Sequence, residues 1–210
     1  MHSRPSSPII ALAAALGFAL AAAPGQAQAP RMPPEFHARV FLAGFPSQLE
    51  VRQAGLRRRV DVATGGIVQT FISDRSRGAL VVMTAAGRQR LAFLFPLSGA
   101  EVNPPIPLDI SAFAGARMTT MGASRVGGRP CRLQRYTAYL GRSGVICASA
   151  DGLVLQMTPD GRRQPLFQVM SITFAKQDNR WFSPPPDYQL SALPGTGGIA
   201  VSRGAAPVSR

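Results

Sequence analysis

Short segments in which apolar and polar residues alternate fill the first half of the chain. In Phe36–Leu42 the residues Phe36, Ala38, Val40 and Leu42 fall on one side and the others on the opposite side. A period of two residues is typical of a β-strand with one buried face. Similar segments, separated by turn signals, are Gln48–Arg52, Leu56–Ala63, Ile67–Ser73, Ala79–Thr84 and Gln89–Phe95. The pattern predicts about six antiparallel strands in a meander, as in an all-β sheet or barrel.

Two of these segments depart from simple alternation. In Leu56–Ala63 the apolar side carries Val60 and Val62, and Arg58 falls on that side and breaks it. Ala79–Thr84 is continuously apolar, which indicates a strand covered on both faces.

The middle of the chain loses this pattern. Ser98–Pro107 is rich in proline and glycine and predicts a loop. Leu108–Ala114 predicts one or two helical turns, with Asp109 or Ser111 as the N-cap and Gly115 at the end.

The second half returns to strands. The predicted segments are Arg117–Arg125, Cys131–Tyr139, Val145–Ser149, Leu153–Met157 and Leu166–Ala175, with Asp151-Gly152 as a hairpin turn. Trp181–Tyr188 then places aromatic residues beside three prolines. Residues 191–210 are rich in Gly, Ala, Ser and Pro without an apolar period, which predicts a disordered tail after a domain at 36–190.

The N-terminus carries the features of a secretory signal peptide. Pro8–Ala23 is an apolar core that is short for a membrane span, and Gly25 and Ala27 form a small-residue cleavage motif. We therefore expect cleavage after Ala27, a flexible lead-in at 28–35, and a soluble domain in the periplasm. The alternative is an uncleaved membrane anchor. No cysteine follows the apolar core, so a lipoprotein anchor is excluded.

The charge balance is strongly basic, with a formal net charge of +13. Lys176 is the single lysine, and the arginines accompany many Ala, Gly and Pro residues, as GC-rich codon usage produces. The charge itself still draws the domain to anionic surfaces such as lipid headgroups. Nucleic acid is not an expected partner of an exported protein.

Two cysteines in an exported chain predict a structural disulfide, Cys131–Cys147. Closing this loop removes about 3 kcal/mol of unfolded-state entropy. A redox-active pair would favour CxxC spacing, which is absent. In a regular hairpin the two cysteines would pair across a turn centred on Tyr139, midway between them, but the turn signal lies near Arg142. A bulge, a longer loop or a diagonal contact between the strands is therefore required to bring the cysteines together.

Catalytic and metal-binding patterns are weak. After cleavage His37 is the one histidine, and no GxSxG motif supplies a nucleophile. Met118 and Met121 have the spacing of a copper-binding MxxM pair, but methionines in a strand are far more often core or surface residues. We therefore expect no enzyme, no metal and no cofactor.

Several segments together resemble a known family. The strand series 49–95, Gly128–Cys131, the hairpin Asp151–Leu155 and the aromatic-proline segment 181–188 are similar to the LolA/LolB-like periplasmic lipoprotein carriers, or to related small exported domains of unknown function. The resemblance covers residues 36–190. It implies a mainly β fold, a strongly curved antiparallel sheet (half-barrel) with one or two short helices and an apolar concave face. The carriers hold acyl chains on that face. Fewer helical segments, a disulfide and a tail distinguish this chain from them.

The resulting hypothesis is non-catalytic binding of an apolar or amphipathic ligand, such as lipid, on the concave face. For any one candidate lining residue, an ordinary core position is the commoner role. The candidates are Leu91, Phe93, Phe95, Leu155, Met157, Met170, Ile172 and Phe174. The hypothesis requires an apolar concavity of a few hundred cubic ångströms. The alternative is an envelope structural or interaction protein whose arginines contact anionic lipid or a protein partner. An enzyme would require a pocket that groups His37 with acids or serine.

Overall fold

A computed structural model describes residues 34–97 and 106–192. The chain divides into two units, Met1–Arg31 and Met32–Arg210, and every described residue belongs to the second. The predicted signal peptide, most of the predicted lead-in and loop, and residues 193–210 of the predicted tail lie outside the described residues.

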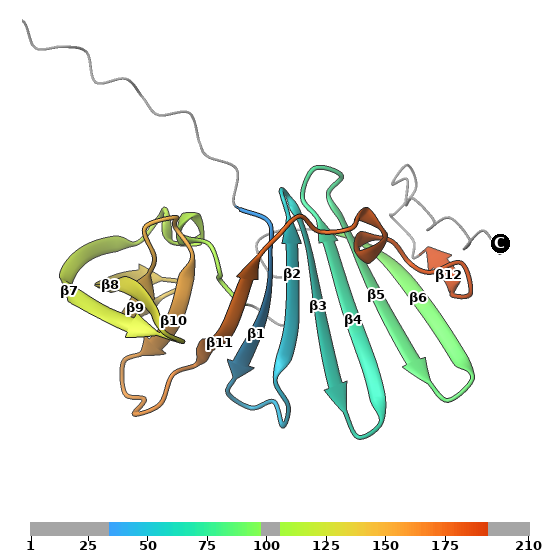
Figure 1. Ribbon diagram of the computed structural model, residues 1–210, viewed down its shortest axis with the longest axis horizontal. Helices are drawn as coiled ribbons and strands as arrows, with labels where there is room; N and C mark the ends of the chain where they lie inside the picture. The colour runs from blue at the N-terminus through green and yellow to red at the C-terminus, as the bar shows by residue number, and fades with distance from the viewer. Residues whose placement is uncertain (1–33, 98–105, 193–210) are drawn as a thin grey trace, which may run out of the picture. The chain divides into compact units, whose positions relative to one another are not determined.

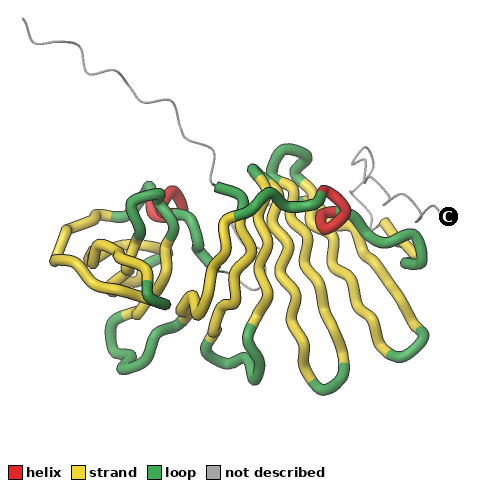
Figure 2. The backbone as a smooth tube through the Cα atoms, viewed as in Figure 1, coloured by secondary structure: helices red, strands yellow, loops and turns green. Residues whose placement is uncertain are grey.

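Twelve strands form one open, strongly curved sheet, so the predicted mainly β fold class is confirmed (Figure 1). The strands are β1 (Phe36–Leu42), β2 (Leu49–Ala54), β3 (Arg57–Thr64), β4 (Ile67–Asp74), β5 (Ala79–Ala86), β6 (Gln89–Pro96), β7 (Arg117–Val126), β8 (Arg129–Tyr139), β9 (Arg142–Ala148), β10 (Val154–Pro159), β11 (Phe167–Phe174) and β12 (Gln189–Ala192). Two short 3-10 helices, η1 (Ile110–Phe113) and η2 (Asn179–Phe182), interrupt the loops (Figure 2). No helix of the described part is long and apolar enough to cross a bilayer.

The sheet order is β12-β6-β5-β4-β3-β2-β1-β11-β10-β9-β8-β7. The first six strands form the predicted meander, and β11 pairs with the free edge of β1 and thereby joins the two halves of the chain. All neighbours are antiparallel except β12, which pairs with β6 in parallel. The strand β12 reaches Ala192, two residues past the expected end of the domain, because β6 offers it an edge.

The two faces of the first six strands belong to different hydrophobic clusters. On what we call the core face, one cross-strand row runs Ala38, Val51, Val60, Phe71, Val82 and Phe93. The first four of these residues are 9% exposed or less and lie in the larger cluster, together with residues of β7–β11 and η1.

The opposite face is covered by the segment Asp178–Leu190, which we call the strap. Phe182, Tyr188 and Leu190 of the strap pack on a second cluster, whose strand residues are Ala54, Ile72, Ala79, Val81, Met83, Ala92 and Leu94. We call this side the strap face. Because Ala79, Val81 and Met83 are buried here while Leu80 and Val82 meet the core, β5 contacts apolar groups on both faces, as its unbroken apolar run predicts.

Cys131 and Cys147 form the predicted disulfide, with Cα atoms 5.4 Å apart. Leu133, not Cys131, lies opposite Cys147, so the bond is diagonal between β8 and β9. The register also shifts between Tyr136 and Tyr139, where Ala138 has a φ of 64°. A bulge and a diagonal contact together therefore bring the two cysteines into contact although the turn is not midway between them. The strand β9 begins at Arg142, three residues before the predicted start at Val145.

Candidate functional site

The eight predicted ligand-binding residues do not gather in one place. Leu155 and Met157 are buried in the larger cluster, at 0% and 3% exposure. Ile172 and Phe174 are partly buried against the same cluster, whereas Met170 is 44% exposed. The remaining three, Leu91, Phe93 and Phe95, are half-buried on the core face of β6.

Leu91, Phe93 and Phe95 of β6 belong to an apolar surface that adjoins the larger hydrophobic cluster on the core face. Phe95 lies opposite Leu80, and Phe93 lies opposite Val82, so all four share the core face. Leu80 and Val82 are half-buried and pack against the larger cluster. We call Leu80, Val82, Leu91, Phe93 and Phe95 the open end of the core face. Burial on this face therefore decreases from β1 towards β6.

Arg58 lies on the same face, where the sequence predicted a break in the apolar side of β3. Its cross-strand row is Gln53, Arg58, Ser73, Leu80 and Phe95. The Arg58 Nε and Nη2 atoms donate to Gln53 Oε1 at 3.0 and 2.8 Å, and Nη1 donates to the Ile106 carbonyl at 3.1 Å. Gln53 and Ser73 are each 3% exposed, so the guanidinium sits in a largely desolvated row.

The charge of Arg58 has no acidic partner among the residues that the structure describes. Burial, helped by the nearby positive charge of Arg75, lowers the pKa of Arg58 to about 10, although the Asp109 carboxylate partly opposes the shift. The group remains protonated at neutral pH. A guanidinium has five N–H donors, and only three are used here. A desolvated cation is normally paired, which makes Arg58 a candidate for contact with an anion.

The arginines on the strap face are all engaged. The guanidinium groups of Arg52 and Arg59 lie 4.3 and 5.2 Å from the Trp181 ring centroid, and both contact Asp61. Arg57 Nη2 donates to Asn179 Oδ1 at 2.8 Å. The sequence reasoning attributed the arginine content to codon usage and missed this role. The signal available was the pair Arg57 and Arg59, two positions apart on one face of β3, combined with an aromatic segment late in the chain.

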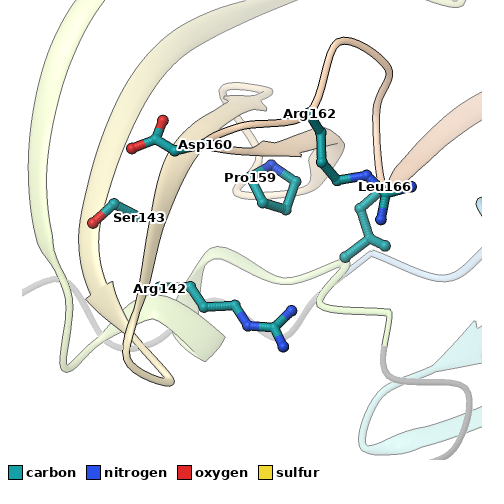
Figure 3. A pocket seen from close by; sticks show the side chains of 6 residues that line it. All are labelled: Arg142, Ser143, Pro159, Asp160, Arg162 and Leu166. Atoms are coloured by element: carbon teal, nitrogen blue, oxygen red, sulfur yellow. The ribbon is translucent and has the colours of Figure 1, made fainter.

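A separate pocket of about 360 Å³ opens beside β9 and β10 (Figure 3). Its lining residues are Arg142, Ser143, Pro159, Asp160, Arg162 and Leu166. None of the predicted ligand-binding residues lines it, so it is not the apolar concavity that the lipid-binding hypothesis requires.

His37, the residue on which an enzyme hypothesis would rest, lies beside an acid. Its ring contacts Glu50, which also accepts from Arg39 Nε at 3.0 Å. Within residues 34–97 and 106–192, no three His, Cys, Asp or Glu side chains are placed to hold a metal ion. Met118 packs against the larger cluster, whereas Met121 is 58% exposed beside a register shift, so the two methionines lie in different surroundings.

These features define a mainly β protein with one curved sheet, an internal disulfide and an incompletely covered apolar face. No protein-family model matches the chain, and no curated protein matches it. Membership of the lipoprotein-carrier superfamily therefore stays a prediction.

Some solved structures are similar. A crystal structure of MucB has a TM-score of 0.36 and 16% identity, and the match covers 71% of this chain and 57% of that chain. The Pseudomonas aeruginosa MucA/MucB complex gives 0.37 and 16%, with 76% and 58% covered. MucB in complex with MucA(peri) gives 0.36 and 16%, with 76% and 57% covered. The chain thus spans less than three-fifths of the length of each.

Proposed function

We propose that the chain is an exported, non-catalytic binding protein for an amphiphile with an apolar tail and an anionic head. The tail lies on the open end of the core face, and the head accepts hydrogen bonds from Arg58. The predicted signal peptide supports export to the periplasm, as does the Cys131–Cys147 disulfide, a bond typical of oxidising compartments. One observation carries the proposal: a guanidinium without a carboxylate partner shares a sheet face with half-buried apolar residues.

The two parts of the surface suit the two parts of an amphiphile. Covering half-buried Val82, Phe93 and Phe95 removes apolar area from water, at about 25 cal/mol per Å². A hydrogen bond to a charged group contributes about 1.5–3 kcal/mol. Ser73 lies between Arg58 and Leu80 in the cross-strand row, so the polar and apolar parts adjoin without a gap.

Calorimetric titration with single-chain amphiphiles below their critical micelle concentration tests the proposal. Dodecanoate and dodecyl phosphate are expected to bind at least about tenfold more tightly than dodecyltrimethylammonium, because only the anions accept from Arg58. R58Q removes this preference, and F93S weakens binding of every chain.

The matched controls lie elsewhere on the surface. R88Q removes an exposed arginine from the β5–β6 turn, and V68S removes an apolar side chain that is 44% exposed. Both retain binding. Failure of dodecanoate to bind, or equal binding by R58Q and R88Q, contradicts the proposal. Mass spectrometry of lipids extracted from protein purified from its own periplasm then identifies the ligand, and no lipid above the level of a control protein counts against it.

The second candidate is an envelope interaction protein that contacts anionic lipid or a protein partner. Several exposed arginines favour it, because their side chains have no hydrogen-bond or ion-pair partner in the described part of the chain. They are Arg75, Arg88, Arg117, Arg132, Arg142, Arg162 and Arg163. Sedimentation with anionic vesicles separates the two candidates. A surface-charge mechanism predicts salt-sensitive binding that R88Q and R132Q reduce and that R58Q leaves unchanged.

A further inference from the structure

The pocket beside β9 and β10 shares no residue with the core-face site. We propose that it binds a small phosphomonoester, with Arg142 and Arg162 holding the phosphate and Pro159 and Leu166 contacting the organic group. This inference is independent of the proposed function.

Backbone hydrogen bonds fix the walls of the pocket. Asp160 N donates to the Ser143 carbonyl at 2.9 Å and joins the end of β10 to the start of β9. Leu166 N donates to the Met157 carbonyl at 2.8 Å, and the Leu166 carbonyl accepts from Ala43 N at 2.8 Å. Asp160 and Leu166 are therefore anchored to paired strands on either side of Arg162 in the β10–β11 loop before a ligand arrives, which lowers the ordering cost of binding.

The interior of the pocket is cationic. Figure 3 shows the guanidinium groups of Arg142 and Arg162 pointing to the side where Leu166 lies, while the Asp160 carboxylate and the Ser143 hydroxyl point the other way. The carboxylate already accepts from Arg135 Nη2 at 2.7 Å. The Arg162 backbone N–H donates to the Pro159 carbonyl at 3.3 Å. The side chains of Arg142 and Arg162 have no hydrogen-bond or ion-pair partner among the described residues. The single acid in the lining therefore does not neutralise them.

Two unneutralised guanidiniums match a phosphate better than a carboxylate. A phosphomonoester carries a charge near −2 at neutral pH and three acceptor oxygens, and guanidinium groups bind such oxygens bidentately. The volume of about 360 Å³ lies within the range of roughly 300–1,000 Å³ typical of small-ligand sites. Pro159 is buried and Leu166 half-buried, so the wall next to the cations is apolar and suits an organic substituent.

Calorimetric titration of the full chain at low salt with phenyl phosphate, inorganic phosphate and benzoate tests the site. Phenyl phosphate is expected to bind most tightly. R142Q and R162Q each weaken it about tenfold, and the double variant abolishes binding. L166S reduces the affinity for phenyl phosphate towards that for inorganic phosphate, which itself is unchanged. R88Q, an equal loss of charge outside the pocket, and R58Q, in the core-face site, both bind as the parent does.

Each outcome is decisive. If R142Q and R162Q bind phenyl phosphate as well as R88Q, or if none of the three probes binds, the proposal fails. Benzoate binding as tightly as phenyl phosphate overturns the phosphate assignment. Equal affinity for both phosphates, lost together in the double variant, overturns the contact of Pro159 and Leu166 with an organic group and assigns the pocket to free phosphate instead. Thermal melts of each variant verify that the substitutions leave the fold intact.

Discussion

The same three strands, β4–β6, present two faces that differ in how completely they are covered. On the strap face Ile72, Val81 and Leu94 are each 5% exposed or less, because the strap packs on them. On the core face the neighbouring Val82 and Phe93 stay half-buried. Successive side chains of a strand point to opposite faces, so the strands alone give both faces a similar share of side chains. The difference in burial therefore arises from the strap, which lies more than eighty residues further along the sequence.

The arginines of β3 show the same contrast within one strand. Arg57 and Arg59 point to the strap face and find Asn179, Asp61 and Trp181. Arg58, between them, points to the core face and finds only neutral acceptors. On the strap face the arginines are paired with side chains of the protein itself. On the core face, hydrogen-bond donors of Arg58 and half-buried apolar residues remain available to a ligand. Our functional proposal rests on this difference between the two faces.

The largest expected effect comes from comparing one phenylalanine of each face. Phe182 is 8% exposed at the centre of the strap contact, and F182A is expected to cost about 3 kcal/mol of unfolding free energy. F93A, at a half-buried position, is expected to cost about 1 kcal/mol. Urea denaturation measures both. Equal losses of unfolding free energy would mean that the open end of the core face is packed as tightly as the strap face, and would contradict the difference between the two faces.

A smaller effect is expected from the charge cluster under the strap. Asp61 accepts from Arg59 Nε at 2.9 Å and from Thr70 Oγ1 at 2.5 Å, and its side chain is 17% exposed. D61N leaves Arg52 and Arg59 without a carboxylate and is expected to cost about 2 kcal/mol. It should also shift the fluorescence of Trp181, the single tryptophan.

The matched control for that prediction is D187N. Asp187 also pairs with an arginine of the sheet, Arg90 at 3.2 Å, but both side chains are about half exposed. Water screens such a pair, so the expected cost is below about 1 kcal/mol. A D61N variant no less stable than D187N would show that the cluster does not hold the strap.

The alternation of Phe36–Leu42 and of the segments that follow predicted the first six strands and their meander, because a period of two is a local property. Local chemistry also predicted the disulfide and a helix cap at Asp109 or Ser111. Asp109 is the cap, and its Oδ1 accepts from Ser111 N at 2.8 Å. The break at Arg58 was visible in the same way and marks the candidate site.

The strap was not predictable in this manner. Its aromatic residues were recognised, but their partners Arg52, Arg57 and Arg59 lie on β2 and β3, and nothing local joins segments so far apart. The strand β12 was missed for the same reason, since its partner β6 is distant in sequence. The pocket at Arg142 and Arg162 depends on how the β10–β11 loop folds back, which no periodicity encodes.

The smallest expected effect is a pH-dependent loosening of the strap at acid pH. Hydrogen bonds from the Arg180 side chain, and then from its backbone N–H, lower the pKa of Asp178 below its ordinary value of 3.8. A lowered folded-state pKa means that the stabilisation is complete above the unfolded pKa and is lost as the pH falls through the folded one. Asp178 caps η2, and its carbonyl accepts from Trp181 N at 3.1 Å. Trp181 fluorescence should therefore show a small step below about pH 4. D178N should remove the step, whereas R58Q, on the other face, should retain it. An unchanged pH profile in D178N would show that the titration of Asp178 does not affect the strap.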